Sequence, residues 1–90
     1  MEAYKIYGIT DCPACLRACA LLMENDIEYS FVESDFSPTY RAVLKKQWAW
    51  QTFPIIIKIS ISENYETFTT LVGGYDELLD LFDCQKSGID

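Results

Sequence analysis

The sequence has no histidine, few basic residues and no long apolar run, and each absence narrows the possible functions. Its 90 residues include 14 acidic and 7 basic side chains, a formal net charge of -7, with no basic cluster. This charge disfavours binding to nucleic acid or to anionic membrane surfaces. No stretch approaches the ~18 uninterrupted apolar residues of a membrane span, and the start MEAYKIYG lacks the features of a secretory signal. We therefore expect a cytoplasmic protein without a nucleic-acid or membrane partner.

Nothing in the sequence divides the chain, because it contains no internal repeat, low-complexity segment or linker. Half of its residues are hydrophobic. That is enough apolar surface for one compact core without a metal or a disulfide framework. The sequence therefore predicts a single domain over residues 1–90.

Three of the four cysteines fall within the segment TDCPACLRAC, residues 10–19. Cys12 and Cys15 form a C-x-x-C pair, which can be a structural disulfide, half of a metal site or a redox dithiol. Cytosolic thiols are kept reduced, which disfavours a permanent disulfide. A zinc site needs further ligands, but there is no histidine, and Cys19 and Cys84 do not form a second C-x-x-C pair. The pattern favours a redox dithiol over a metal site.

Periodicity and turn signals predict seven secondary-structure elements in the order β-α-β-α-β-β-α. This order, with a βαβ unit first and a hairpin later, predicts an α/β fold with a four-stranded mixed sheet packed between helices. The predicted strands are 3–7, 27–34, 54–61 and 65–72, and the predicted helices are 13–25, a segment capped by Ser37, and a segment from Tyr75.

Each predicted helix has one face that we expect to be buried. The residues of these faces are Leu16, Cys19, Ala20 and Met23 in the first helix, Tyr40, Val43, Leu44 and Trp48 in the second, and Leu78, Leu81 and Phe82 in the last.

The predicted helix start gives Cys12 and Cys15 different chemistry. Cys12 precedes the helix, where free amides and the helix dipole favour a thiolate, and Cys15 lies one turn away. Pro13 suits the first helical position. Asp11 opposes ionisation of Cys12 unless its carboxylate turns toward solvent. We expect Cys12 to attack a disulfide and Cys15 to resolve the product.

Three segments resemble the glutaredoxin family of the thioredoxin superfamily. YGITDCPACLRACALL is similar to its active-site segment, in which C-P-x-C opens the first helix. TFPI, residues 52–55, is similar to its T-V-P segment, and GGYDEL, residues 73–78, resembles its glycine pair followed by an acidic helix start. The matches occur in the family's order and span nearly the whole chain.

This resemblance implies a thioredoxin fold and a monomeric oxidoreductase that uses glutathione to reduce protein disulfides and glutathione mixed disulfides. Ribonucleotide reductase is one candidate recipient of its electrons, and no metal is expected. The resemblance also implies a cis peptide bond before Pro54. It implies catalytic roles for Cys12 and Cys15, and glutathione contacts at Gln51, Thr52, Phe53, Pro54, Gly74, Tyr75 and Asp76.

Two departures from the family pattern keep alternatives open. Ile9 stands where the family usually has a basic residue that assists the thiolate and a glutathione carboxylate, and Ala14 replaces the usual aromatic residue between the cysteines. The first departure gives weight to a redoxin that is reduced by thioredoxin reductase. An iron–sulfur carrier, with a cluster held between two chains by Cys12 and glutathione, is a further alternative that Pro13 disfavours.

Four further side chains have two interpretations each. Cys19 is either a third redox thiol or, as we favour, a buried small residue. Cys84 is expected to be inert or a free surface thiol. Trp48 and Trp50 either line the glutathione groove or cover the core.

Overall fold

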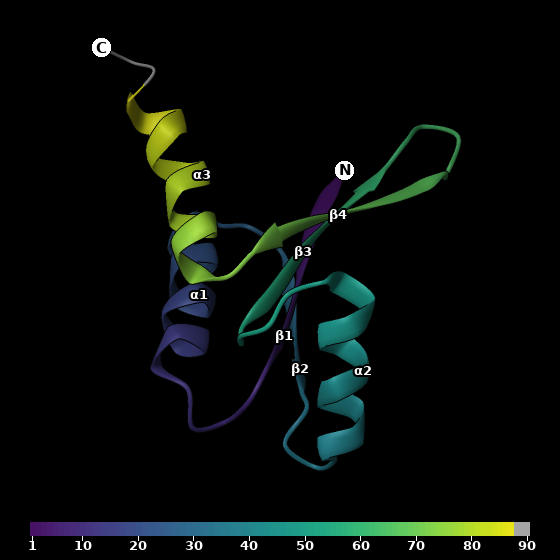
Figure 1. Cartoon of the computed structure of the whole chain (residues 1–90). Coiled ribbons are helices and arrows are strands. Elements are labelled where there is room, and N and C mark those ends of the chain that lie inside the picture. The colour runs from purple at the N-terminus through teal and green to yellow at the C-terminus, as the bar shows by residue number, and fades with distance from the viewer. Residues whose placement is uncertain (88–90) are drawn as a thin grey trace.

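The computed structural model describes the backbone of residues 1–87 and the side-chain surroundings of residues 1–82. Its element order confirms the predicted β-α-β-α-β-β-α arrangement (Figure 1). No helix in this described part is long and apolar enough to cross a bilayer. The elements are β1 (Glu2–Gly8), α1 (Pro13–Glu24), β2 (Tyr29–Glu33), α2 (Pro38–Trp48), β3 (Ile55–Ile61), β4 (Thr67–Gly73) and α3 (Tyr75–Ser87).

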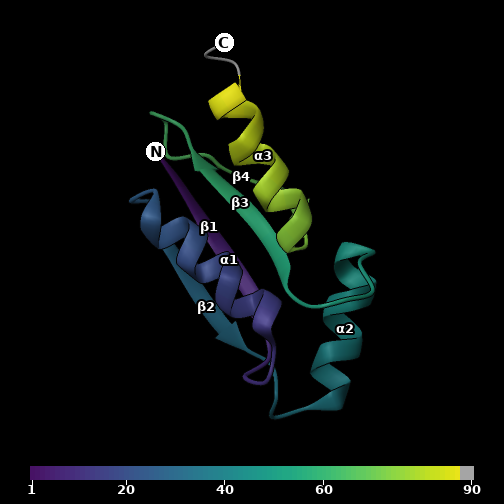
Figure 2. The same cartoon turned by 90° about the vertical axis from the view of Figure 1, so that its left-hand side faces the viewer.

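The four strands form one mixed sheet in the order β2-β1-β3-β4. β1 pairs in parallel with β2 and antiparallel with β3, and β3 and β4 form the predicted antiparallel hairpin. Helices α1 and α3 lie side by side on one face, with α2 on the other side of the sheet (Figures 1 and 2). The predicted fold class is therefore confirmed.

The main hydrophobic core lies between the sheet and the α1–α3 pair. Apolar side chains of β1 and β3 face this pair, as the period-two alternation of a strand requires. Burial of such side chains contributes roughly 1.5–3 kcal/mol each before entropy is counted. The core residues are Tyr4, Ile6, Ala18, Leu22, Ile56, Leu78 and Phe82, with Leu81 partly buried beside them.

The predicted buried face of α1 is wrong. Leu16 and Met23 are each 64% exposed, Ala20 is also exposed, and Cys19 is half-buried. The buried residues are Cys15, Ala18 and Leu22, which share one helical face at the expected spacing. The position of the helix start explains this difference. Because Cys12 is the N-cap, the rotation of the helix about its axis places Cys15 toward the sheet.

Helix α2 begins as predicted, because Ser37 is its N-cap and accepts a hydrogen bond from the Tyr40 amide at 3.1 Å. Of its predicted buried face, however, only Leu44 is fully buried, whereas Val43 is 52% exposed. In Figure 1, α2 lies beside the lower part of the sheet, and the far end of the β3–β4 hairpin extends away from it.

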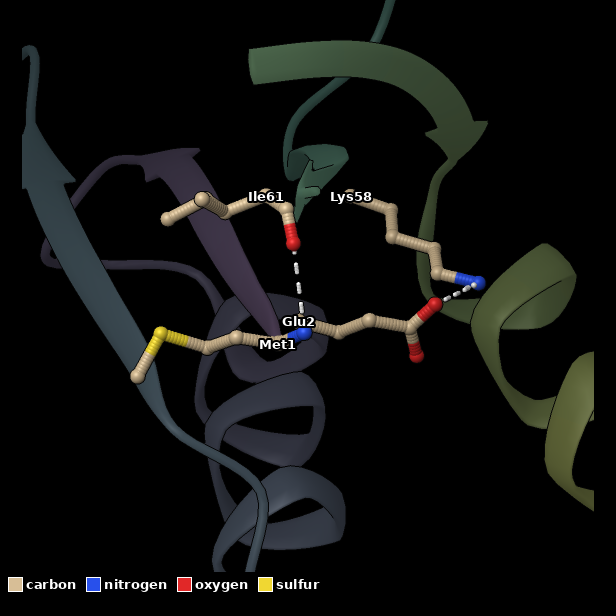
Figure 3. Close-up of polar contacts among 4 residues, drawn as sticks. All are labelled: Met1, Glu2, Lys58 and Ile61. Carbon is tan, nitrogen blue, oxygen red and sulfur yellow. Dashed lines mark hydrogen bonds and ion pairs between the residues drawn. The ribbon is translucent and has the colours of Figure 1, made fainter. Parts of the chain in front are cut away.

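At the end of the sheet away from the cysteines, the first two residues of the chain contact β3 (Figure 3). The Met1 ammonium donates to the Ile61 carbonyl at 3.3 Å, and Lys58 pairs with Glu2 at 2.9 Å. Because the ion pair is partly exposed, it contributes only about 0–1 kcal/mol. These contacts fix the β1–β3 register at the end distant from the cysteines.

Candidate active site

Cys12 caps α1 with its sulfur. Its backbone is extended, and its Sγ accepts a hydrogen bond from the Cys15 amide at 3.2 Å. α1 has no acidic residue in its first turn, so no carboxylate of this helix competes for the positive end of the dipole. Amide donors at a helix start stabilise negative charge on sulfur. The local structure therefore supports Cys12 as the nucleophile.

Cys15 is fully buried beneath the helix start. A Cβ atom on Gly8 would lie 2.8 Å from the Cys15 Sγ and 2.8 Å from the Phe31 ring, so this position of β1 requires glycine. Burial, followed by the hydrogen bond with Cys12, raises the pKa of the Cys15 thiol from its ordinary 9.0 to about 12. Cys15 is thus a protonated thiol at neutral pH.

Hydrogen bonds tie the loop that carries Cys12 to the loop after β2. The Thr10 amide donates to Asp35 Oδ1 at 2.9 Å, and the Thr10 hydroxyl donates to the same carboxylate. The buried Ser34 hydroxyl donates to the Gly8 carbonyl at 2.8 Å. Arg41 Nη1 donates to the Ser34 and Asp35 carbonyls at 2.8 and 3.0 Å. This network holds the cysteine loop from the side of α2.

The segment before β3 meets the Cys12 sulfur. The Phe53–Pro54 peptide bond is cis, which confirms the expectation from the resemblance. The Cys12 thiol donates to the Phe53 carbonyl with Sγ and O 3.9 Å apart, a long contact for a hydrogen bond. Segments that are 41 residues apart in the chain therefore meet at one atom.

A groove of about 270 Å³ opens beside this contact. Ala14 and Arg17 of α1 line one side, residues 52–54 another, and residues 74–77 at the start of α3 a third. Trp50 completes the wall, and its ring would lie 3.1 Å from a Cβ on Gly73, whose φ is +125°. A side chain at Gly73 would therefore be strained and would also crowd the Trp50 indole.

Most of the predicted glutathione contacts meet in this groove. Their roles remain predictions, but their placement is shared: Thr52, Phe53, Pro54, Gly74, Tyr75 and Asp76 all line it. Gln51 is exposed and does not line the groove.

Sequence reasoning overlooked Arg17 and Glu77 as groove residues. Arg17 lies three residues after Ala14 on the same side of α1, and this spacing was the available signal. Glu77 Oε1 accepts from the Gly74 amide at 2.9 Å, which is the cap of α3. Trp50 lines the groove, as one of the two interpretations expects, and Trp48 does not.

The structure also places Asp11 and Cys19, two side chains near the cysteine pair. Asp11 is exposed, so its carboxylate is turned toward solvent. Cys19 is half-buried next to Tyr29; burial raises the pKa of the Cys19 thiol, and a hydrogen bond with Tyr29 partly opposes this rise. Cys12, Cys15 and Cys19 are free thiols. The side chain of Cys84 lies outside the described residues.

A four-stranded mixed sheet, a C-x-x-C pair at the start of the first helix and a cis proline facing it define a thioredoxin-fold dithiol protein. The family model named Glutaredoxin matches residues 4–59, more than half of the chain. The chain therefore belongs to the glutaredoxin family, and its fold and dithiol are consistent with thiol–disulfide oxidoreductase chemistry.

Solved structures agree with this assignment. The solution structure of a glutaredoxin from Brucella melitensis is 31% identical, with a TM-score of 0.69 over 96% of this chain and 84% of that one. A buckwheat glutaredoxin–glutathione complex has a TM-score of 0.71 and 18% identity over 94% of this chain and 72% of that one, which shows the shared fold. A search of curated proteins finds no match.

Proposed function

We propose that this protein is a glutathione-dependent oxidoreductase that reduces glutathione mixed disulfides and protein disulfides through Cys12 and Cys15. The observation that carries the proposal is the position of the Cys12 sulfur. It accepts an amide at 3.2 Å, and it touches Phe53, a residue of the groove that ends at the start of α3. A reactive sulfur and a peptide-sized groove thus share one residue.

In the first step the Cys12 thiolate attacks the glutathione sulfur of a mixed disulfide. A Cys12–glutathione disulfide forms, and the other thiol leaves as its thiolate. Ala14 and Phe53 line the groove. The small side chain of Ala14 leaves room for the three sulfur atoms to align, and the Phe53 backbone offers an edge to an extended peptide.

In the second step the Cys12–glutathione disulfide is resolved. A second glutathione thiolate attacks the glutathione sulfur, which releases glutathione disulfide and regenerates Cys12. The competing route needs Cys15 to lose its proton and attack Cys12, and the pKa of Cys15, raised to about 12 chiefly by burial, slows that attack. The buried thiol therefore favours resolution by glutathione for small substrates, and Cys15 acts when a protein disulfide needs two electrons at one site.

Glutathione fits the groove through its γ-glutamyl end. A helix N-terminus readily binds a carboxylate, and the start of α3 lines the groove at Gly74, Tyr75 and Asp76. The complex of a buckwheat relative with glutathione supports this choice of ligand. We extend the proposal to Gln51 as an outer contact and to ribonucleotide reductase as one recipient of electrons.

Ile9 favours one second candidate, a redoxin that thioredoxin reductase reduces directly. The loop before Cys12 has no basic residue that would attract a glutathione carboxylate. Under this alternative the Cys12–Cys15 disulfide is the form that the reductase recognises.

The test compares two electron sources with one substrate, hydroxyethyl disulfide. With glutathione and glutathione reductase we expect turnover that depends on glutathione concentration, and with thioredoxin reductase alone we expect none. NADPH oxidation at 340 nm measures both. Turnover with thioredoxin reductase and none with glutathione would replace the proposed function by the second candidate.

A further inference from the structure

We propose that the outer face of α1 is a self-association surface, on which two copies of the chain pack antiparallel about a twofold axis at Ala20. In this arrangement Glu24 of one copy meets Arg17 of the other. Arg17 lines the groove beside Cys12, so the second copy contributes a charged residue to the edge of the site. The inference does not depend on the proposed reaction, and it replaces the expected monomer by a weak dimer at high protein concentration.

Three apolar side chains form a row along the outer side of α1. Leu16 and Met23 are each 64% exposed, and Ala20 between them is also exposed. Their spacing of four and then three residues is that of the apolar positions in a two-helix coiled coil. Figure 2 shows α1 in front of the sheet, and no other described element lies over its outer side. This apolar row is therefore available to a second helix.

A second row on the same face carries two opposite charges. Arg17 and Glu24 are both exposed and are seven residues apart, so they form a charged row parallel to the apolar row. Among residues 1–82 the ion pair is Lys58–Glu2, so neither charge of this row is paired within that part of the chain. The face is neutral, whereas the whole chain has a net charge of -7. Two copies can therefore approach each other here with little of their overall repulsion.

The order of the two charges favours antiparallel helices. Arg17 lies toward the N-terminal end of α1, and Glu24 is its last residue. A twofold axis at Ala20 that reverses the helix direction places apolar row against apolar row and each arginine against a glutamate. Parallel helices would bring the two arginines to the same end. Because Ala20 lies on the axis, its small side chain lets the helices approach closely.

The dimer should be weak, because its interface consists mainly of one face of a 12-residue helix. Stable complexes bury about 1,200–2,000 Å² in total, and transient ones lie at or below the lower end of this range. We therefore expect assembly between about 10 µM and about 1 mM protein. Among the described residues that line the groove, Arg17 is the single cation, and the dimer pairs it with a carboxylate of the second copy.

Sedimentation equilibrium of the reduced protein measures this dimer directly. We expect R17E and E24R each to weaken dimerisation about tenfold, because each change brings like charges together at two symmetric contacts. The double variant R17E/E24R restores opposite charges and should return the dissociation constant to within about twofold of the wild-type value. This restoration distinguishes a contact between the two residues from a general effect of charge.

The apolar row has a matched control on another helix. M23Q removes an apolar side chain that is 64% exposed in α1, and V43Q removes one that is 52% exposed in α2. We expect M23Q to weaken dimerisation about fivefold to tenfold and V43Q to leave it unchanged. Urea unfolding of dilute samples should show that every variant is folded, because each altered side chain is exposed.

Three results would overturn the inference. The first is a wild-type protein that stays monomeric up to about 1 mM. The second is equal weakening by M23Q and V43Q, which would show that the outer face of α1 has no special part in assembly. The third is a double variant R17E/E24R that dimerises no better than the single variants. All three leave the glutathione-dependent reaction untouched, since the comparison of the two reductases tests that separately.

Discussion

Helices α1 and α3 begin at the same groove, but their first turns carry opposite chemistry. α1 is capped by the Cys12 sulfur, has no acidic residue in its first turn and continues into the buried Cys15. α3 has Asp76 and Glu77 in its first turn, and Glu77 caps the Gly74 amide. Carboxylates stabilise a helix start, and Glu77 of α3 takes the Gly74 amide but no other backbone amide of the described residues. In the first turn of α1 no carboxylate lies beside the capping sulfur of Cys12, whereas a carboxylate caps α3.

The largest effect should come from removing the sulfur that caps α1. Cys12→Ser keeps an N-cap but should lower turnover of hydroxyethyl disulfide more than about a thousandfold, because the nucleophile is gone. Cys15→Ser should retain turnover within about tenfold, because glutathione resolves the mixed disulfide. The coupled glutathione reductase assay measures both. Equal losses in the two variants would show that the cysteines act only as a pair.

A second difference between the two helix starts is that the first turn of α1 carries the buried, protonated thiol of Cys15. The folded protein holds the Cys15 proton up to about pH 12, whereas the unfolded chain loses it near 9.0. The stabilisation is therefore complete below pH 9 and is lost as pH rises toward 12, with a slope of up to about 1.4 kcal/mol per pH unit.

Urea unfolding of the reduced protein between pH 8 and 10.5 tests this sign, with Cys15→Ala as the reference. The free energy of unfolding should fall more steeply with pH in the wild-type protein than in the variant. The other groups that titrate at alkaline pH are present in both proteins, so the difference reports Cys15. Parallel curves would contradict the assigned burial of the Cys15 proton.

A third test gives α1 an acidic residue in its first turn, as α3 has. Ala14→Glu places a carboxylate in the first turn of α1, and it should slow alkylation of Cys12 by iodoacetamide about threefold to tenfold. Ala14→Gln fills the same space without charge and isolates the electrostatic part. An identical rate in the two variants would mean that the helix start does not set the reactivity of the sulfur.

The smallest effect concerns the cap of α3. Glu77→Ala removes the acceptor for the Gly74 amide and should lower the free energy of unfolding by about 1 kcal/mol. Asp80→Ala, an exposed position one turn later in the same helix, should change it by less than about 0.5 kcal/mol. Chemical denaturation gives both values, and equal values would show that Glu77 is not an effective cap.

The order of elements could be predicted from the sequence because each has a local signal. Ser37 caps α2 as expected, and the β-branched run of residues 54–61 forms β3 with a partner in β4. The buried face of α1 could not be predicted, because Leu16 and Leu22 are both apolar. Which of them is buried depends on the rotation of the helix about its axis, which is set by the N-cap at Cys12. Local pattern predicts that a helix exists, whereas the side that it buries depends on contacts with the rest of the fold.

In the candidate site, too, some features could be predicted from the sequence and others could not. The cysteine pair and the residues 74–76 were visible as motifs, and they meet at the groove or at its edge. The separation of Trp48 from Trp50 was not visible, because it depends on Ala49, whose left-handed backbone (φ 52°) ends α2 and redirects the chain.

The position of Trp50 has a practical consequence. The sequence contains two tryptophans, and one of them forms a wall of the groove next to Gly73 and Gly74. A molecule that enters the groove changes the polarity around this fluorophore, and its emission therefore reports occupancy without any label. Trp48, which does not line the groove, supplies the constant background against which that optical signal is read.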